Sequence, residues 1–158
     1  MKKPYGRAVR QKGHNWERVV ARMLGVAVRA ECKRGLGQAR ATGEVADVDG
    51  VAGLWIECKV GARTNPRAAL AQATCATLDH EVRTRKVSIM VAADTAAMPI
   101  AVCKDDRKQP FVCMYLPDFL AILSAGAHFA ITYDTFIAQV PAERERIRLA
   151  NREDTDAA

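Results

Sequence analysis

Apolar residues in the chain recur with a period of two in some stretches and of three to four in others. The period of two dominates residues 54–60, where Leu, Ile, Cys and Val alternate with Trp, Glu and Lys. Alternation predicts a strand, because successive side chains on a strand point to opposite faces. A shorter alternating stretch covers residues 44–48, and Asp49-Gly50 between the two is a turn signal. These residues predict a β-hairpin.

The first helical stretch follows a basic N-terminal segment. Its apolar positions from Trp16 to Leu24 are spaced i, i+3, i+4, i+7 and i+8, which is the spacing of one helix face. Asn15 is a suitable N-cap, and Gly25 suits the position after the last helical residue. Residues 1–13 are therefore expected to form a flexible basic arm, and a short strand is expected over 26–32.

The rest of the pattern alternates helices with strands. Asn65-Pro66 is a cap followed by a proline at the first helical position, and the small residues after it suit close packing on a sheet. Residues 87–93 fit either a strand or an extension of that helix. The later elements expected are strands over 99–104 and 110–116, a helix over 116–123 and a charged helix over 141–152. This succession predicts an α/β fold with a central mixed sheet flanked by helices.

Composition is that of an ordinary globular chain. The 158 residues suit one domain, with 49% hydrophobic and 27% charged residues. We expect an arm over 1–13, the domain over 14–125 and a partly helical C-terminal extension over 126–158. The five cysteines form no C-x-x-C pair and the three histidines are scattered, which argues against zinc and a disulfide framework. With no signal peptide or membrane-spanning stretch, the sequence predicts a cytoplasmic protein.

The net charge of +6 is unevenly distributed. Residues 1–40 hold 11 Lys and Arg against 2 Asp and Glu, or +9, and the remainder holds 13 against 16, or −3. A basic N-terminal third indicates a polyanionic partner, although such segments are often only solvated. Residues 33–43 combine glycines with cations, which suits either contact with a phosphate backbone or a surface loop.

The predicted hairpin also carries the candidate chemistry. Glu57 and Lys59 share a strand face, and Asp47 and Asp49 share a face of the preceding strand. Pairing the strands brings an Asp, a Glu and a Lys together, and Mg²⁺ binds through one or two carboxylates, water and phosphate oxygens. The alternative is a surface hairpin with a solvated Glu57–Lys59 pair. Periodicity does not separate the two aspartates; Asp49 has a sufficient role as a turn residue, which favours Asp47 for the site.

Two motifs resemble those of a known family. Ala46-Asp47 followed by residues 56–59, Ile-Glu-Cys-Lys, resembles the core motif of the PD-(D/E)XK nuclease superfamily, with Ala where that family often has Pro. Residues 12–18, Lys-Gly-His-Asn-Trp-Glu-Arg, resemble the Lys-Gly-x-x-x-Glu-Arg opening of archaeal-type and phage Holliday-junction resolvases. The resemblance covers residues 12–123 and implies a restriction-endonuclease-like core.

The resemblance implies a magnesium-dependent endodeoxyribonuclease, with Mn²⁺ able to substitute. Asp47, Glu57 and the main-chain carbonyl of Cys58 would hold the metal ion. Lys59 would orient the attacking water or stabilise the phosphate. Glu17 would be a further acid leaning toward the metal; its other interpretation is an acid placed favourably in the first turn of its helix.

The remaining implied roles concern DNA and assembly. Lys12, Lys33, Arg34 and Arg40 would contact DNA, and Gln72 would support the site unless it is simply exposed. The protein would be a homodimer, because cutting a junction symmetrically needs two sites. The alternatives are a restriction-like or repair nuclease acting on linear DNA, and a DNA-binding module with an inactive site.

Overall fold

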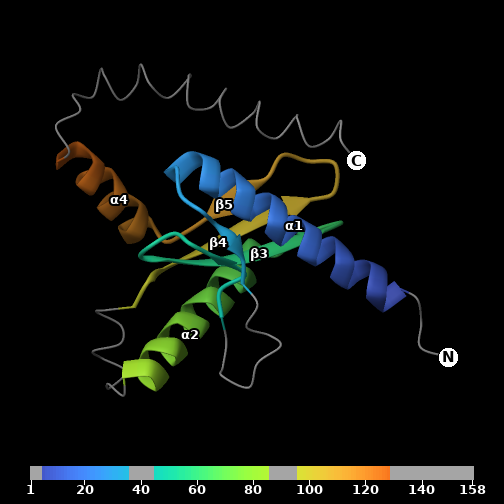
Figure 1. Ribbon diagram of the computed structural model, residues 1–158, viewed down its shortest axis with the longest axis horizontal. Coiled ribbons are helices and arrows are strands. Elements are labelled where there is room, and N and C mark those ends of the chain that lie inside the picture. The colour runs from blue at the N-terminus through green and yellow to red at the C-terminus, as the bar shows by residue number, and fades with distance from the viewer. Residues whose placement is uncertain (1–4, 36–44, 86–95, 129–158) are drawn as a thin grey trace.

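A computed structural model of the protein describes residues 5–35, 45–85 and 96–128. These residues form an α/β fold with a five-stranded mixed sheet and three helices (Figure 1). The mixed α/β architecture predicted from the sequence is therefore confirmed. What the sequence predicts for residues 87–93 and 141–152 lies outside the described residues. No helix in the described part is long and apolar enough to cross a membrane.

The sheet is built around one parallel pair of long strands. β3 and β4 run parallel over eight residues each, from Leu54 opposite Met98 to Gly61 opposite Asp105, and all other neighbours are antiparallel. The strand order follows the chain: β1 (Lys33–Arg34), β2 (Val48–Asp49), β3 (Leu54–Gly61), β4 (Met98–Asp105) and β5 (Phe111–Cys113). A parallel pair needs a crossover connection, and α2 (Pro66–Arg85) lies in it.

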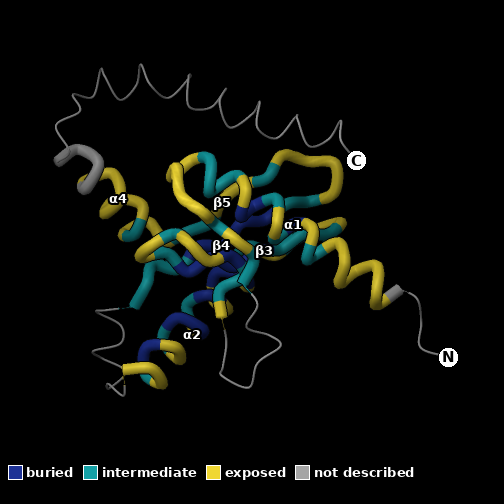
Figure 2. The backbone as a smooth tube through the Cα atoms, in the orientation of Figure 1, coloured by how far each residue is buried: buried dark blue, intermediate teal, exposed yellow. Residues whose placement is uncertain are grey.

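The alternating side chains of residues 54–60 pack against different helices on the two faces of the sheet. Ile56 and Cys58 point to one face and pack with Trp16 of α1 (Tyr5–Val28). Trp55 points to the other face and packs with Ala73 of α2. The predicted strand and its two faces are confirmed, and Figure 2 shows buried residues in the central strands and in α2.

The N-terminus of α2 forms as its sequence predicts. Pro66 is the first helical residue, and the side-chain oxygen of Asn65 accepts a 3.1 Å hydrogen bond from the Ala68 N–H. Just before this cap, Thr64 donates to Asp105 at the end of β4 from its N–H and its hydroxyl, at 2.8 and 2.9 Å. The start of α2 is thus tied to the carboxyl ends of β3 and β4.

The first helix differs from its prediction. α1 begins at Tyr5, so residues 5–13 are helical and not part of an arm. The Arg, Ala, Gln and Lys residues of this segment favour a helix, which continues upstream of Asn15 despite Gly6 and Gly13. Gly25 lies inside α1, and the left-handed residue beyond its end is Arg29, at φ 54°.

Three strand predictions also need correction. The strand expected over 26–32 is absent: residues 26–28 belong to α1, and β1 is Lys33–Arg34. β2 begins only at Val48, and β5 is three residues long and ends before Met114. Alternation alone indicates which residues suit a strand, whereas the strand's actual length depends on the partner available for pairing. The last helix of the described residues, α4 (Leu116–His128), begins where the sequence predicts.

Candidate active site

The candidate site lies where β2 meets the middle of β3. Glu57 lies in the centre of the sheet and is only 6% exposed, which is unusual for an acidic residue. Its carboxylate accepts a 2.5 Å hydrogen bond from the ammonium of Lys59, which is itself 38% exposed. Burial opposes the charge of Lys59, but the bond to Glu57 and the negative charge around it leave the Lys59 pKa raised. The pair is partly buried and therefore differs from a solvated surface pair.

Asp47 is held beside this pair by main-chain hydrogen bonds. Its carboxylate accepts a 2.8 Å bond from the Cys58 N–H, and its own N–H donates to the Ile56 carbonyl at 2.9 Å. Burial, followed by the nearby charge of Glu57, raises the pKa of Asp47 to about 6 against the opposing effect of the Cys58 bond. Two carboxylates therefore lie close enough to disfavour each other's ionisation.

Glu17 reaches the same place from α1. Its negative charge also raises the pKa of Asp47, so the side chains lie within electrostatic reach. Glu17 forms an ion pair with Arg34 of β1, and both side chains are mostly buried. Because α1 begins at Tyr5, Glu17 lies in the middle of the helix and not in its first turn. The helix-dipole interpretation of this acid is therefore wrong.

Asp49 is separated from the acidic cluster. It is exposed, and its carboxylate accepts a 2.8 Å hydrogen bond from the N–H of Gly50, which adopts φ 111°. Asp49 thus serves the turn between β2 and β3, and Asp47 is the aspartate that lies beside Glu57.

The thiol of Cys58 takes no part in the polar cluster. It packs into the core on the α1 face of the sheet, and burial raises its pKa far above the usual thiol range. A buried thiol of this kind is not a nucleophile. Only the main chain of Cys58 faces the site, through the N–H bonded to Asp47.

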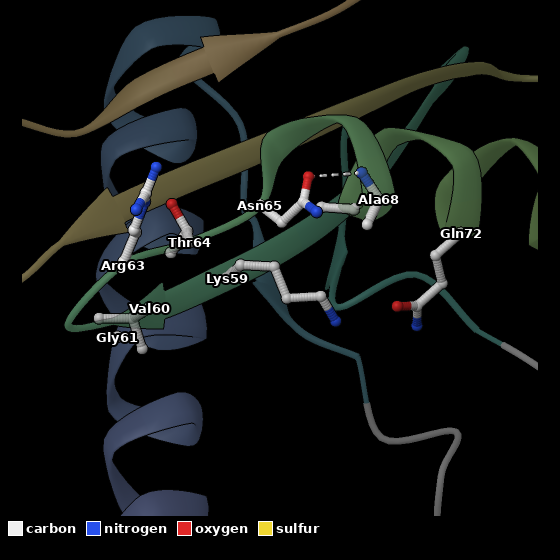
Figure 3. A pocket seen from close by; sticks show the side chains of 9 residues that line it. Lys59, Val60, Gly61, Arg63, Thr64, Asn65, Ala68 and Gln72 are labelled. Atoms are coloured by element: carbon white, nitrogen blue, oxygen red, sulfur yellow. Dashed lines mark hydrogen bonds between the residues drawn. The ribbon is translucent and has the colours of Figure 1, made fainter.

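A cavity of about 300 Å³ opens beside Lys59, between the end of β3 and the start of α2. The ammonium of Lys59 and the amide of Gln72 point into the same space (Figure 3). The other lining residues are Val60, Gly61, Arg63, Thr64, Asn65, Ala68 and Ala69. The Lys59 ammonium, amide and hydroxyl groups and a helix N-terminus make this space suited to an anion, whereas the guanidinium of Arg63 points away from Lys59 (Figure 3).

The residues predicted to contact DNA occupy different surroundings. Lys12 forms an ion pair with Asp106, and both side chains remain well exposed. Lys33 is exposed on the edge strand β1, whereas Arg34 next to it is engaged by Glu17. Arg40 lies outside the described residues. Sequence reasoning missed Arg63 in the cavity wall, a cation four residues after Lys59 and just before the α2 cap.

The donor set fits a hard divalent cation. Asp47 and Glu57 supply two carboxylates. The repulsion between their negative charges is relieved when a cation binds between them. Among the described residues no group of three or more His, Cys, Asp or Glu side chains is placed to hold a metal ion. A site for Mg²⁺ needs no such group, because water and substrate phosphate oxygens complete its coordination.

Comparison of the chain with protein-family models, with curated proteins and with solved structures finds no match.

Proposed function

We propose that the protein is a metal-dependent DNA endonuclease of the PD-(D/E)XK type, with a restriction-endonuclease-like core. The observation that carries this proposal is the convergence of Asp47, Glu57 and Lys59 beside a cavity lined by cations. Burying these charges is costly for the fold, and a phosphate-cleaving site provides a reason for the cost. The sheet supports the proposal as well, since Glu57 and Lys59 share a face of β3 and the main-chain bonds of Asp47 to Ile56 and Cys58 hold it beside them.

Each residue has a defined task in phosphodiester hydrolysis. Asp47 and Glu57 would hold Mg²⁺ or Mn²⁺, with the Cys58 carbonyl as a further ligand. The bound ion would supply charge neutralisation and a more acidic water. Lys59, oriented by its bond to Glu57, is placed to hold the attacking water and to stabilise negative charge on the phosphate. Gln72 and Arg63 line the space beside Lys59 that the phosphate would enter.

The preferred substrate in this proposal is a four-way DNA junction, and the active species is a homodimer. An exposed apolar surface supports the second copy: Phe111, Val112, Tyr115, Leu116, Phe119, Leu120, Ile122 and Leu123 are all exposed on β5, α4 and the residues between them. β5 is also at the edge of the sheet. Contiguous exposed apolar residues of this kind mark interaction surfaces.

One assay tests the activity and separates its alternatives. The protein is incubated with labelled four-way junctions and with linear duplexes of the same sequence, with Mg²⁺, with Mn²⁺ and with EDTA. Metal-dependent cleavage of junctions supports a resolvase, and equal cleavage of both substrates supports a nuclease for linear DNA. Binding without cleavage under every condition would leave an inactive DNA-binding module and overturn the proposal.

A further inference from the structure

The N-terminal half of α1 is exposed on all sides. Every residue from Gly6 to Lys12 is exposed, and Trp16 is the first buried residue of the helix. Figure 2 shows this part of α1 projecting from the body of the molecule. The projecting turns carry Arg7, Arg10 and Lys12, and no acid precedes Glu17. This basic part of the helix is stabilised little by packing against the rest of the protein, and its charge suits an anionic partner.

This basic part of the helix leads directly to the candidate site. Arg10 lies seven residues before Glu17, which is two helical turns or about 10 Å along the axis. Residues seven apart lie on nearly the same helix face, and Gly13 lies between them on that face. Within the described residues Arg10 has no ion-pair partner, whereas Lys12 is paired with Asp106. Arg10 is thus available to a ligand that passes along α1 toward Glu17.

Gly13 leaves open space between the two charged residues. A Cβ at Gly13 would have one neighbour within 4 Å, the Glu17 carboxylate oxygen at 3.9 Å. Gly25 of the same helix is different, because a Cβ there would come within 2.9 Å of the Ala30 carbonyl oxygen. Close packing explains the glycine at position 25. At position 13, no described atom is close enough to exclude a larger side chain. Gly6 has open space as well, but only Gly13 lies beside the Glu17 carboxylate, where the open helix face would let a ligand backbone come close to the acidic cluster.

We propose that the Arg10–Gly13–Glu17 face of α1 holds the DNA strand beside the phosphate that is cleaved. Arg10 binds a phosphate of that strand, and Gly13 lets the sugar-phosphate backbone pass close to the helix before it reaches the cluster of Glu17 and Asp47. The exposed ion pair between Lys12 and Asp106 links this part of the helix to the turn between β4 and β5. This inference rests on the proposed nuclease function, because it assigns a substrate path to that site.

Added bulk at Gly13 tests the path. We expect Gly13→Leu to weaken junction binding about tenfold, because the side chain occupies the space of the backbone, and Gly13→Ala to have a smaller effect in the same direction. The matched control is Gly6→Leu, since Gly6 also has open space around it and lies on the same helix beyond Arg10. Gly6→Leu should bind as the parent does. Thermal unfolding of all three variants checks the fold, because replacing a glycine inside an exposed helix with Ala or Leu should leave the protein at least as stable as the parent.

Charge removal provides the second test. Arg10→Gln should reduce the slope of log affinity against log salt by about 0.9, the value for one phosphate contact. Arg83→Gln is the control, since it removes one exposed arginine near the far end of α2. Parent-like binding by Gly13→Leu, or equal slopes for the two arginine variants, would overturn the path. If the parent binds but never cleaves, the nuclease function fails while these binding comparisons still decide the path.

Discussion

Asp47 accepts a 2.8 Å hydrogen bond from the main-chain N–H of Cys58, between Glu57 and Lys59 in the sequence. This bond holds one carboxylate next to another that is buried at 6% exposure. The raised pKa of Asp47 shows that the arrangement is unfavourable for the ionised acid. Binding sites often retain an energetically unfavourable arrangement of charges, because the bound ligand relieves it.

Neutralising Asp47 should stabilise the protein at neutral pH. Its pKa is raised from 3.8 to about 6 by burial and by Glu57, so between these values the folded state binds the proton more tightly than the unfolded state does. Stability therefore falls as pH rises through this window and stays lower above it. Asp47→Asn keeps an acceptor for the Cys58 N–H and should raise the free energy of unfolding at pH 7 by about 1–3 kcal/mol. Urea unfolding of the parent and the variant at pH 4 and pH 7 measures this increase, which should be smaller at pH 4.

The same variant should lose activity, and the second aspartate provides the contrast. Asp47→Asn removes a proposed metal ligand, and cleavage should fall at least about 100-fold while junction binding persists. Asp49→Asn should cut as the parent does, because an amide oxygen can accept the Gly50 N–H as the carboxylate does. Single-turnover cleavage of a labelled junction measures both variants. An inactive Asp49→Asn beside an active Asp47→Asn would reverse our assignment of the two residues.

A divalent cation should stabilise the folded protein in a pH-dependent way. Metal binding needs ionised carboxylates, and the Asp47 carboxyl is largely protonated below about pH 6. Mn²⁺ at 100 times its dissociation constant should add about 2.7 kcal/mol at pH 7.5, and the same concentration should add much less at pH 5. Thermal unfolding with and without Mn²⁺ measures this. Equal stabilisation of Asp47→Asn and the parent would place the ion elsewhere.

The sequence predicts the centre of the fold better than its start. The alternation from Leu54 to Val60 identifies β3 and both of its faces, because burial on the two sides of a strand leaves a period of two. Asn65 and Pro66 identify the start of α2, since both act on their nearest backbone neighbours. The start of α1 at Tyr5 carried no such signal, because the residues around Arg10 suit a solvated helix and a flexible arm equally.

The acidic site was predictable in part for the same reason. Glu57 and Lys59 follow from the period of one strand, and the turn role of Asp49 follows from Gly50 beside it. The pairing of Glu17 with Arg34 joins α1 to β1 and is visible only once the fold brings them together. No local pattern in the sequence encodes a contact of that kind.

That ion pair changes what is expected of the basic segment after α1. Lys33 is exposed, so Lys33→Ala should reduce the salt slope of junction binding by about 0.9. Arg40→Ala should do the same if the segment contacts DNA. Arg34→Ala should leave the slope nearly unchanged and should reduce cleavage instead, because it frees the Glu17 carboxylate. Binding titrations over a range of salt concentrations separate the two effects, and a slope reduced by Arg34→Ala would return this residue to the DNA interface.

Glu57 and Lys59 should differ in what their removal affects. Glu57→Gln deletes a negative charge near the phosphate, so cleavage should fall about 100-fold while binding is kept or strengthened. Lys59→Ala deletes a positive charge from the cavity and should weaken both binding and cleavage. Affinity measured in Ca²⁺ and single-turnover rates measured in Mg²⁺ distinguish the two. Parent-like cleavage by both variants would show that the hydrogen-bonded pair is only structural.

The apolar surface of β5 and α4 predicts how two copies associate. Leu116 is 66% exposed and Leu120 53%, and a charge at either position has no cost in an exposed monomer but a high cost in a buried interface. The parent should therefore have the mass of a dimer at micromolar concentration, and Leu116→Asp with Leu120→Asp should have the mass of a monomer. Val9→Asp is the control for the masses measured without DNA, since Val9 is 52% exposed and lies on α1, not on β5 or α4.

Light scattering on the full chain, with and without a junction, measures the masses, and an unchanged far-ultraviolet circular dichroism spectrum shows that the variants are folded. In the monomeric variant each nuclease site remains intact, because none of its residues lies on β5 or α4. Single nicks should therefore persist while paired cuts across the junction disappear, since paired cuts need two sites held together. A parent that is monomeric both alone and on DNA would rule out this interface.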